Sequence, residues 1–224
     1  MALKIEIYSD VICPWCYLGE SRLKKALESF PETTEIEIKH LPYELNPATA
    51  EAGVDRKKYL EAKYGARIQQ ADQRLKSLGQ AMGIEYNFEK AERIPNTLKA
   101  HRLIWFAAQK GVQEKAVNGL FKAYFTDGID IGDEHELASV ASEWEMDSYE
   151  VLQFLKSNKG VEQVRELEEK AYNLEITGVP FFIFNGKSAV SGAQEVETFK
   201  EILKNQLNHQ DTKGAKKSEN QDRV

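Results

Sequence analysis

Cysteine is scarce in this chain: Cys13 and Cys16 are the only two among 224 residues. A disulfide between them would close a two-residue loop, which constrains the unfolded chain too little to stabilise the fold much. Histidine is scarce as well, with four residues and no pair at ligand spacing. A structural zinc site needs four ligands, usually a second C-x-x-C or paired histidines, so we expect no metal.

The chain also lacks an excess of positive charge, a long apolar run and a signal segment. Its net charge is −6 and its pI about 5.4, which gives no electrostatic case for a nucleic-acid partner. No stretch approaches the ~18 apolar residues that span a bilayer, and the N-terminus shows no basic-then-apolar leader. We therefore expect a cytoplasmic protein with no membrane partner, in which a C-x-x-C is catalytic or metal-binding rather than a stable disulfide.

The chain does have enough hydrophobic residues for a core. A mass of 25.5 kDa with 42% hydrophobic residues supports one domain with an insertion, or two small domains. Alternating apolar residues predict strands over Leu3–Ser9 and Thr34–His40. Between about Asp55 and Leu174 the pattern is helical, and helices are expected over 56–64, 66–82, 97–110, 114–125, 134–142, 148–158 and 160–174.

Strand character returns near the end of the chain. Phe181–Phe184 and Lys187–Val190 flank Asn185-Gly186, which predicts a hairpin, and a last helix is expected from about Val196 to Gln206. The order β-α-β, helical insert, β-β-α predicts an α/β fold with one small mixed sheet. We expect a discontinuous sheet domain over 1–50 and 175–207, a helical insertion over 51–174, and a polar, disordered tail over 208–224.

The two cysteines form the motif Cys13-Pro14-Trp15-Cys16, between the first strand and the helix that follows it. A helix N-terminus stabilises a thiolate through its unpaired N–H groups and partial positive charge. Proline at a first helical position loses no hydrogen bond. We expect Cys13 at the helix start, exposed and with a lowered pKa, and Cys16 one turn along on the same face. This arrangement is suited to thiol chemistry.

Three segments of the chain resemble the DsbA family of thioredoxin-fold oxidoreductases, specifically its cytosolic FrnE-like branch. They are Ser9–Gly19 with the C-x-x-C, Asn96–Leu103 in the helical region, and Ile176–Phe182 followed by Ser191–Gln194. The resemblance covers nearly everything from Lys4 to Gln206. It implies a thioredoxin-like fold with a large all-helical domain inserted.

The resemblance also implies roles for named residues. Cys13 would be the attacking thiol and Cys16 the resolving thiol of a dithiol–disulfide exchange. A cis peptide bond between Val179 and Pro180 would face them, and Val179 would offer its backbone to an extended substrate segment. The partners would be protein or peptide thiols and disulfides, with glutathione as a further thiol partner and no other cofactor.

Four more residues are candidate substrate contacts, and two of them, His101 and Asn96, have a structural alternative. Pro14 and Trp15 lie between the cysteines, where Trp15 would serve as a platform for substrate. His101 would orient substrate or carry protons near the thiols, or would simply pack a helix and bond one carbonyl. Asn96 would contact substrate or cap the helix that begins near Thr97.

Two other functions remain open on the sequence. Related proteins with the inserted thioredoxin fold are glutathione-dependent isomerases and transferases, including 2-hydroxychromene-2-carboxylate isomerase and the kappa-class glutathione transferases. Those enzymes typically carry a serine where Cys13 stands, so the presence of both cysteines favours redox chemistry. A peptide-binding or chaperone-like module without turnover is the third possibility. The direction of electron flow, the substrate and the oligomeric state are not determined by these patterns.

Overall fold

A four-stranded sheet lies at the centre of the computed structural model, which describes residues 2–218 and, for burial, the side chains of residues 2–208. The strands are β1 (Leu3–Ser9), β2 (Ile36–Pro42), β5 (Phe181–Phe184) and β6 (Ser188–Ser191), in the order β2-β1-β5-β6. β1 and β2 run parallel, whereas β5 is antiparallel to both β1 and β6. The sheet is therefore mixed, as expected, and β1 occupies an inner position.

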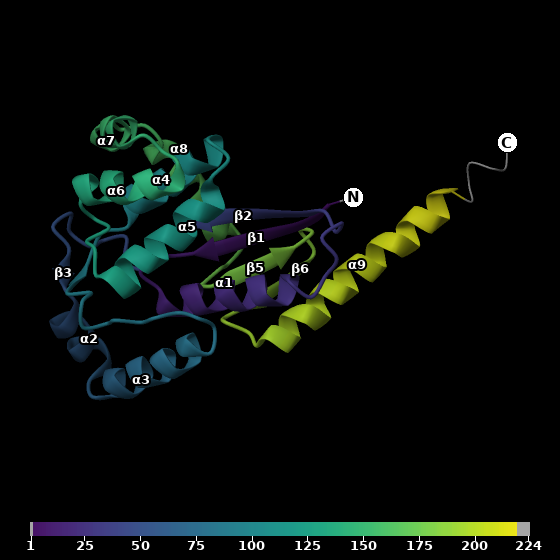
Figure 1. Ribbon diagram of the computed structural model, residues 1–224, viewed down its shortest axis with the longest axis horizontal. Coiled ribbons are helices and arrows are strands. Elements are labelled where there is room, and N and C mark those ends of the chain that lie inside the picture. Colours follow the sequence, from purple (N-terminus) through teal and green to yellow (C-terminus); the bar gives the residue numbers. More distant parts are fainter. Residues whose placement is uncertain (1, 219–224) are drawn as a thin grey trace.

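Helix α1 (Pro14–Leu27) and the first part of α9 (Val196–Ser218) cover one face of this sheet (Figure 1). Alternate side chains of β1 point at them, and the register places Ile7 opposite Phe182 on the same face. Phe182 in turn makes an edge contact with Phe199 of α9. α1 packs on this face of the sheet, and the chain reaches the start of α1 through a short turn after the end of β1.

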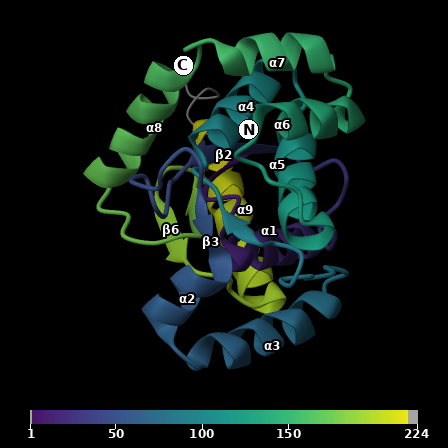
Figure 2. The same ribbon diagram turned by 90° about the vertical axis from the view of Figure 1, so that its left-hand side faces the viewer.

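The remaining helices lie between β2 and β5 in the chain. They are α2 (Arg56–Tyr64), α3 (Arg67–Gln80), α4 (Leu98–Gln109), α5 (Gln113–Lys122), α6 (Glu134–Ala141), α7 (Ser148–Lys156) and α8 (Val161–Asn173). α8 covers the other face of the sheet, where Ala171 packs with Tyr8 and Leu41. Figure 2 shows α4 to α8 in the upper part of the view, and α2 and α3 at the bottom, below α1.

Three features differ from the expected secondary structure. The inserted region is not wholly helical, because β3 (Val54–Asp55) and β4 (Arg93–Ile94) pair in a short antiparallel ribbon. The helix expected over 114–125 is an α-helix only to Lys122 and widens at its end into a π-helical turn over Ala123–Asp127. α9 continues to Ser218, well past Gln206, and residues 219–224 of the tail that was expected to be disordered lie outside the described residues.

The largest buried cluster joins the helical region to the start of α1. Cys13, Cys16 and Leu18 belong to it, together with side chains of α3 to α7 such as Leu103 and Phe121. Burial of this apolar surface fixes the helical region against the C-x-x-C. The thiol motif therefore lies where the sheet and the inserted helices meet.

Candidate active site at the start of helix α1

Cys13 is the N-cap of α1, as the sequence predicts. Its backbone is extended, with φ −92° and ψ 109°, and its N–H donates to the Asp10 carbonyl at 2.9 Å. Pro14 follows in the first turn, where its missing N–H leaves no bond unmade. The N–H of Cys16 donates back to the Cys13 carbonyl at 3.0 Å, so the two cysteines share the first turn of the helix.

The peptide bond between Val179 and Pro180 is cis, and its loop faces the cysteines. The Cys13 thiol lies 3.8 Å from the Val179 carbonyl oxygen, which it meets as a weak S–H donor. Gly19 of α1 packs beneath this loop, because a Cβ at that position would lie 3.0 Å from Pro180 Cγ. The structure thus brings Cys13, Cys16, Val179 and Pro180 together.

Cys13 is not exposed, which corrects one expectation. Only 5% of its surface is accessible, and Cys16 is fully buried. The reason is that the loop carrying Val179 lies over the Cys13 sulfur, a contact between residues 166 positions apart that local pattern does not reveal. A substrate reaches Cys13 by lying against this loop, in the place where an extended segment could pair with the Val179 backbone.

The Cys16 thiol is held in its neutral form. Burial raises its pKa well above the usual range, and the neighbouring Cys13 and the Glu20 carboxylate add to the rise, while the Asp10 backbone opposes it. Glu20 lies one turn after Cys16 on the same face of α1 and is itself buried, with Oε2 3.2 Å from His40 Nδ1 of β2. Sequence analysis did not single out this pair, because its members belong to separate elements.

Asp10 and His101 form a second buried pair beneath the turn that precedes Cys13. Asp10 accepts the Leu45 N–H at 2.7 Å, and its carboxylate lies 3.4 Å from His101 Nε2, within ion-pair range but not aligned as a hydrogen bond. Burial of His101 lowers its pKa, but Asp10, with Glu168 and Glu44 beyond it, outweighs burial and raises it. Among the residues that the structure describes, no backbone carbonyl accepts a hydrogen bond from the His101 side chain, in contrast to the structural alternative for it.

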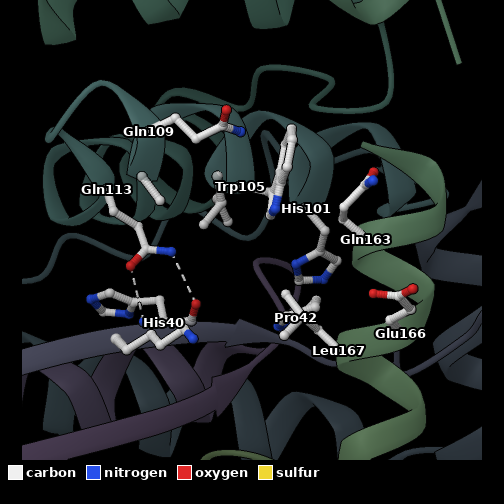
Figure 3. A pocket seen from close by; sticks show the side chains of 12 residues that line it. His40, Pro42, His101, Trp105, Gln109, Gln113, Gln163, Glu166 and Leu167 are labelled. Carbon is white, nitrogen blue, oxygen red and sulfur yellow. Dashed lines mark hydrogen bonds between the residues drawn. The ribbon is translucent and has the colours of Figure 1, made fainter. Parts of the chain in front are cut away.

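His101 also lines a pocket of about 340 Å³ between β2, α4 and α8 (Figure 3). Trp105 forms one wall of this pocket, and Gln113 binds both the N–H and the carbonyl of His40 at its rim. The pocket lining does not include either cysteine. His101 thus connects this pocket to Asp10, in the turn before Cys13, rather than facing the sulfurs directly.

The Asn96 side chain makes two hydrogen bonds to backbone at the start of α4. Its Oδ1 accepts the Leu98 N–H at 3.0 Å, and its Nδ2 donates to the Thr49 carbonyl at 2.9 Å. The side chain of Thr97, the N-cap residue itself, makes no capping bond. Both ends of the Asn96 amide are therefore bound to backbone, which favours the capping alternative over a substrate contact.

Two residues that sequence analysis missed hold the Pro14-Trp15 dipeptide. The Tyr86 hydroxyl donates to the Pro14 carbonyl at 2.6 Å, and the Arg74 guanidinium of α3 lies 5.8 Å from the centre of the half-buried Trp15 ring. Tyr86 in turn packs on Gly79, where a Cβ would come within 2.5 Å of its ring. No sequence signal identifies these contacts, since Tyr86 lies 72 positions from Pro14.

The residues that the structure describes contain neither a candidate metal site nor a membrane-spanning helix. Among them, no cluster of three or more His, Cys, Asp and Glu side chains has an arrangement that could hold a metal ion. None of the helices that the structure describes combines the length and the apolar composition needed to cross a bilayer.

A C-x-x-C at the start of a helix, opposite a cis-proline loop on this sheet, defines a thioredoxin-fold protein of the DsbA type, with an inserted helical region. Residues 4–204 match the family model of the DSBA-like thioredoxin domain. The chain belongs to that family, which confirms the resemblance read from its sequence.

Solved structures agree with this assignment. A probable DsbA oxidoreductase from Streptomyces coelicolor is 32% identical with a TM-score of 0.86, and the match covers 92% of this chain and 90% of that one. A 2-hydroxychromene-2-carboxylate isomerase is 20% identical with a TM-score of 0.68, covering 94% and 98%. The cytosolic disulfide reductase DsbM from Pseudomonas aeruginosa, solved with GSH, is 15% identical with a TM-score of 0.64, covering 92% and 99%. The last two likenesses concern the fold alone.

Proposed function

We propose that this protein is a thiol–disulfide oxidoreductase that exchanges electrons through Cys13 and Cys16. The observation that carries the proposal is the shared first turn of α1, with the Cys13 thiol 3.8 Å from the carbonyl of the cis-proline loop. That placement leaves one sulfur beside a backbone that can hold an extended substrate and the second sulfur behind it. Membership of the DsbA-like family supports the oxidoreductase class.

In the reducing direction the Cys13 thiolate attacks one sulfur of a substrate disulfide. A Cys13–substrate disulfide forms and the other substrate sulfur leaves as a thiolate, which takes up a proton. Cys16 then loses its proton and attacks Cys13, so the Cys13–Cys16 disulfide forms and the second substrate thiolate leaves. Two electrons pass to the substrate, and the oxidising direction is the same sequence reversed.

Burial gives the two sulfurs different roles in this reaction. The raised pKa of Cys16 keeps it protonated while Cys13 meets substrate, so that it does not compete for the substrate disulfide. Glu20 and His40 lie one turn behind it as buried polar groups. Val179 supports the substrate backbone, and Pro180, which has no N–H, leaves that backbone free to pair.

The partners that we propose are protein or peptide thiols and disulfides, with glutathione as a small thiol partner, acting in the cytoplasm. The DsbM structure, which is described as a cytosolic disulfide reductase with GSH, supports both the glutathione partner and the compartment. No further cofactor is needed, because the two cysteines store the electron pair that the exchange transfers.

The test is turnover of a disulfide-bonded peptide or of insulin with a glutathione redox buffer. We expect exchange in the wild type, and its loss in Cys13→Ser. Full activity of Cys13→Ser would overturn the proposal. The fold shared with an isomerase gives the alternative a clear signature: a glutathione-dependent isomerisation that Cys16→Ala leaves unchanged. Peptide binding that neither cysteine variant affects, without turnover, would instead indicate a binding module.

A further inference from the structure

Positive charge is concentrated in helices α2 and α3, although the whole chain is acidic. Residues 56–80, which we name the basic arm, carry seven lysines and arginines and two carboxylates, a net charge of +5 against −6 for the entire chain. Arg56 pairs with Asp72, and Lys76 pairs with Glu89. In the described part of the chain, no carboxylate lies within ion-pair distance of the other five, which are exposed: Lys57, Lys58, Lys63, Arg67 and Arg74.

The unpaired cations at the starts of α2 and α3 do not stabilise these helices. Arg56, Lys57 and Lys58 form the first turn of α2, and Arg67 begins α3, while neither helix has an acidic residue in its first turn. Cations at a helix N-terminus oppose the helix dipole and destabilise the helix. α2 also has no buried side chain, whereas a helix this short normally depends on packing of an apolar face. The unpaired cations at the two helix starts therefore reduce the stability of these helices, although Asp55 caps α2 and Asp72 pairs with Arg56.

The basic arm lies beside the thiols. α3 runs past the start of α1 (Figure 2), and the guanidinium of Arg74 lies over Trp15, between the two cysteines. Leu78 and Met82, in and just after α3, pack on the cluster that contains Cys13 and Cys16. The arm is thus fixed against the motif on one side and open to solvent on the other. A polypeptide that brings a sulfur to Cys13 has its flanking residues within reach of this surface.

We propose that the basic arm docks an acidic segment of the disulfide-bearing protein or peptide substrate, and so selects substrates with Asp and Glu near the reacting cysteine. The inference rests on the proposed exchange at Cys13. Complementary charge raises the association rate and excludes like-charged partners more than it tightens binding. Trp15 and Arg74 would form the point where the arm meets the reacting disulfide.

The experiment compares two oxidised peptides that differ only in the residues beside their disulfide, Glu in one and Lys in the other. Exchange with the reduced protein is followed by stopped flow at about 0.01 M and about 1 M salt, where the Debye length falls from about 30 Å to about 3 Å. We expect the Glu peptide to react about tenfold faster or more at low salt, with most of the preference lost at high salt. The variant K57Q/K58Q/R67Q/R74Q should bring the ratio of the two rates close to one.

A matched variant controls for net charge: K156Q/K170Q/K187Q/K204Q removes the same charge from exposed lysines with no ion-pair partner among the described residues. It should keep the Glu preference. Equal rates for the two peptides in the wild type would overturn the proposal. So would an equal loss of the Glu preference in the arm variant and in the control variant. Oxidised glutathione is a further substrate in the same assay. If the arm variant slows exchange with oxidised glutathione but with neither peptide, the occupant of the arm is not a peptide segment.

A binding measurement separates this inference from the proposed function. Copies of both peptides with serine in place of cysteine are titrated into the oxidised protein by fluorescence anisotropy. Binding of the Glu peptide that the arm variant loses supports docking even if no exchange occurs, in which case the oxidoreductase function fails alone. Exchange without any charge preference in rate or binding means that the arm proposal fails alone.

Discussion

At the scale of single residues, the structure gives two cysteines in one helical turn unlike environments. Cys13 lies under the Val179 carbonyl with 5% of its surface accessible, whereas Cys16 is fully enclosed and its pKa is raised by burial. Sequence position identified both residues, since C-x-x-C at a helix start follows from local pattern. The family resemblance placed the cis Val179–Pro180 loop opposite them, as observed. The burial of Cys13 under that loop and the Tyr86 hydroxyl on Pro14 were not predicted, because those contacts join distant parts of the chain.

The difference between the thiols predicts selective alkylation. Iodoacetamide added to the reduced protein near neutral pH should modify Cys13 and leave Cys16 free, because Cys16 is both inaccessible and held neutral. Mass spectrometry of the digested protein measures the two sites separately. Unfolding in urea should make both sites react, which serves as the control. Equal labelling of the native protein would contradict the assigned environments.

Tyr86→Phe tests the bond to the motif. The variant loses the 2.6 Å hydrogen bond to the Pro14 carbonyl and keeps the ring, so the free energy of unfolding should fall by about 1 kcal/mol. Tyr17→Phe is the matched control, because the Tyr17 hydroxyl has no hydrogen bond among the described residues while its ring packs in the same aromatic cluster. Urea unfolding of the three proteins is the measurement. An equally large loss of unfolding free energy in Tyr17→Phe would show that the effect of Tyr86→Phe does not come from the hydrogen bond to Pro14.

At the scale of elements, α4 ties the helical region to the sheet and to the turn before Cys13. His101 reaches Asp10 from its first half, and the next residue, Arg102, points to the connection between α7 and α8. The Arg102 guanidinium donates to four backbone carbonyls there, those of Phe154, Leu155, Ser157 and Lys159. One helix therefore positions both the buried pair beneath the motif and the end of α7.

The Asp10–His101 pair predicts a pH dependence of stability. Because the pKa of His101 is raised in the folded protein, its contribution is complete below the unfolded value of 6.5 and is lost as pH rises through the folded value. His101→Gln should lower the free energy of unfolding by about 3 kcal/mol at about pH 6, and by less at about pH 8.5. Exposed His135→Gln is the control and should change neither value. A loss in His101→Gln that is the same at both pH values would contradict this account.

Arg102 offers a second test at this scale. Arg102→Met keeps much of the apolar stem but leaves four carbonyls without their charged donor, so we expect the free energy of unfolding to fall by about 3 kcal/mol or more. Arg102→Lys keeps the charge with fewer donors and should recover part of the loss. Chemical denaturation measures both. Equal stability of the lysine variant and the wild type would show that the forked geometry is not needed.

At the scale of the whole molecule, periodicity accounts for most of the fold. Strands β1 and β5 and helix α2 begin and end at the expected residues, and the remaining main elements differ at their ends. The β3–β4 ribbon was missed because a strand of two residues shows no alternation. The π-helical turn at Ala123–Asp127 and the length of α9 also escaped prediction, since neither interrupts the local helical pattern.

The functional surroundings of the motif depend on assembly of these elements. α3 was expected as a helix, but its approach to Trp15 results from packing across the molecule, as does the juxtaposition of Glu20 and His40. Local pattern therefore located the reactive sulfurs, and the family resemblance located the cis-proline loop opposite them. The side chains that hold the Pro14-Trp15 dipeptide and the buried pair behind Cys16 became visible only in three dimensions.

The central claim is that Cys13 and Cys16 exchange disulfides in the order attack and resolution. The most direct measurement is trapping of the mixed disulfide in Cys16→Ala with a disulfide-bonded peptide, read by intact mass and by digestion. The account predicts a peptide adduct on Cys13 that persists in Cys16→Ala, is resolved in the wild type, and does not form in Cys13→Ala. Absence of any adduct in Cys16→Ala, under conditions where a small thiol reduces the same peptide, would contradict it.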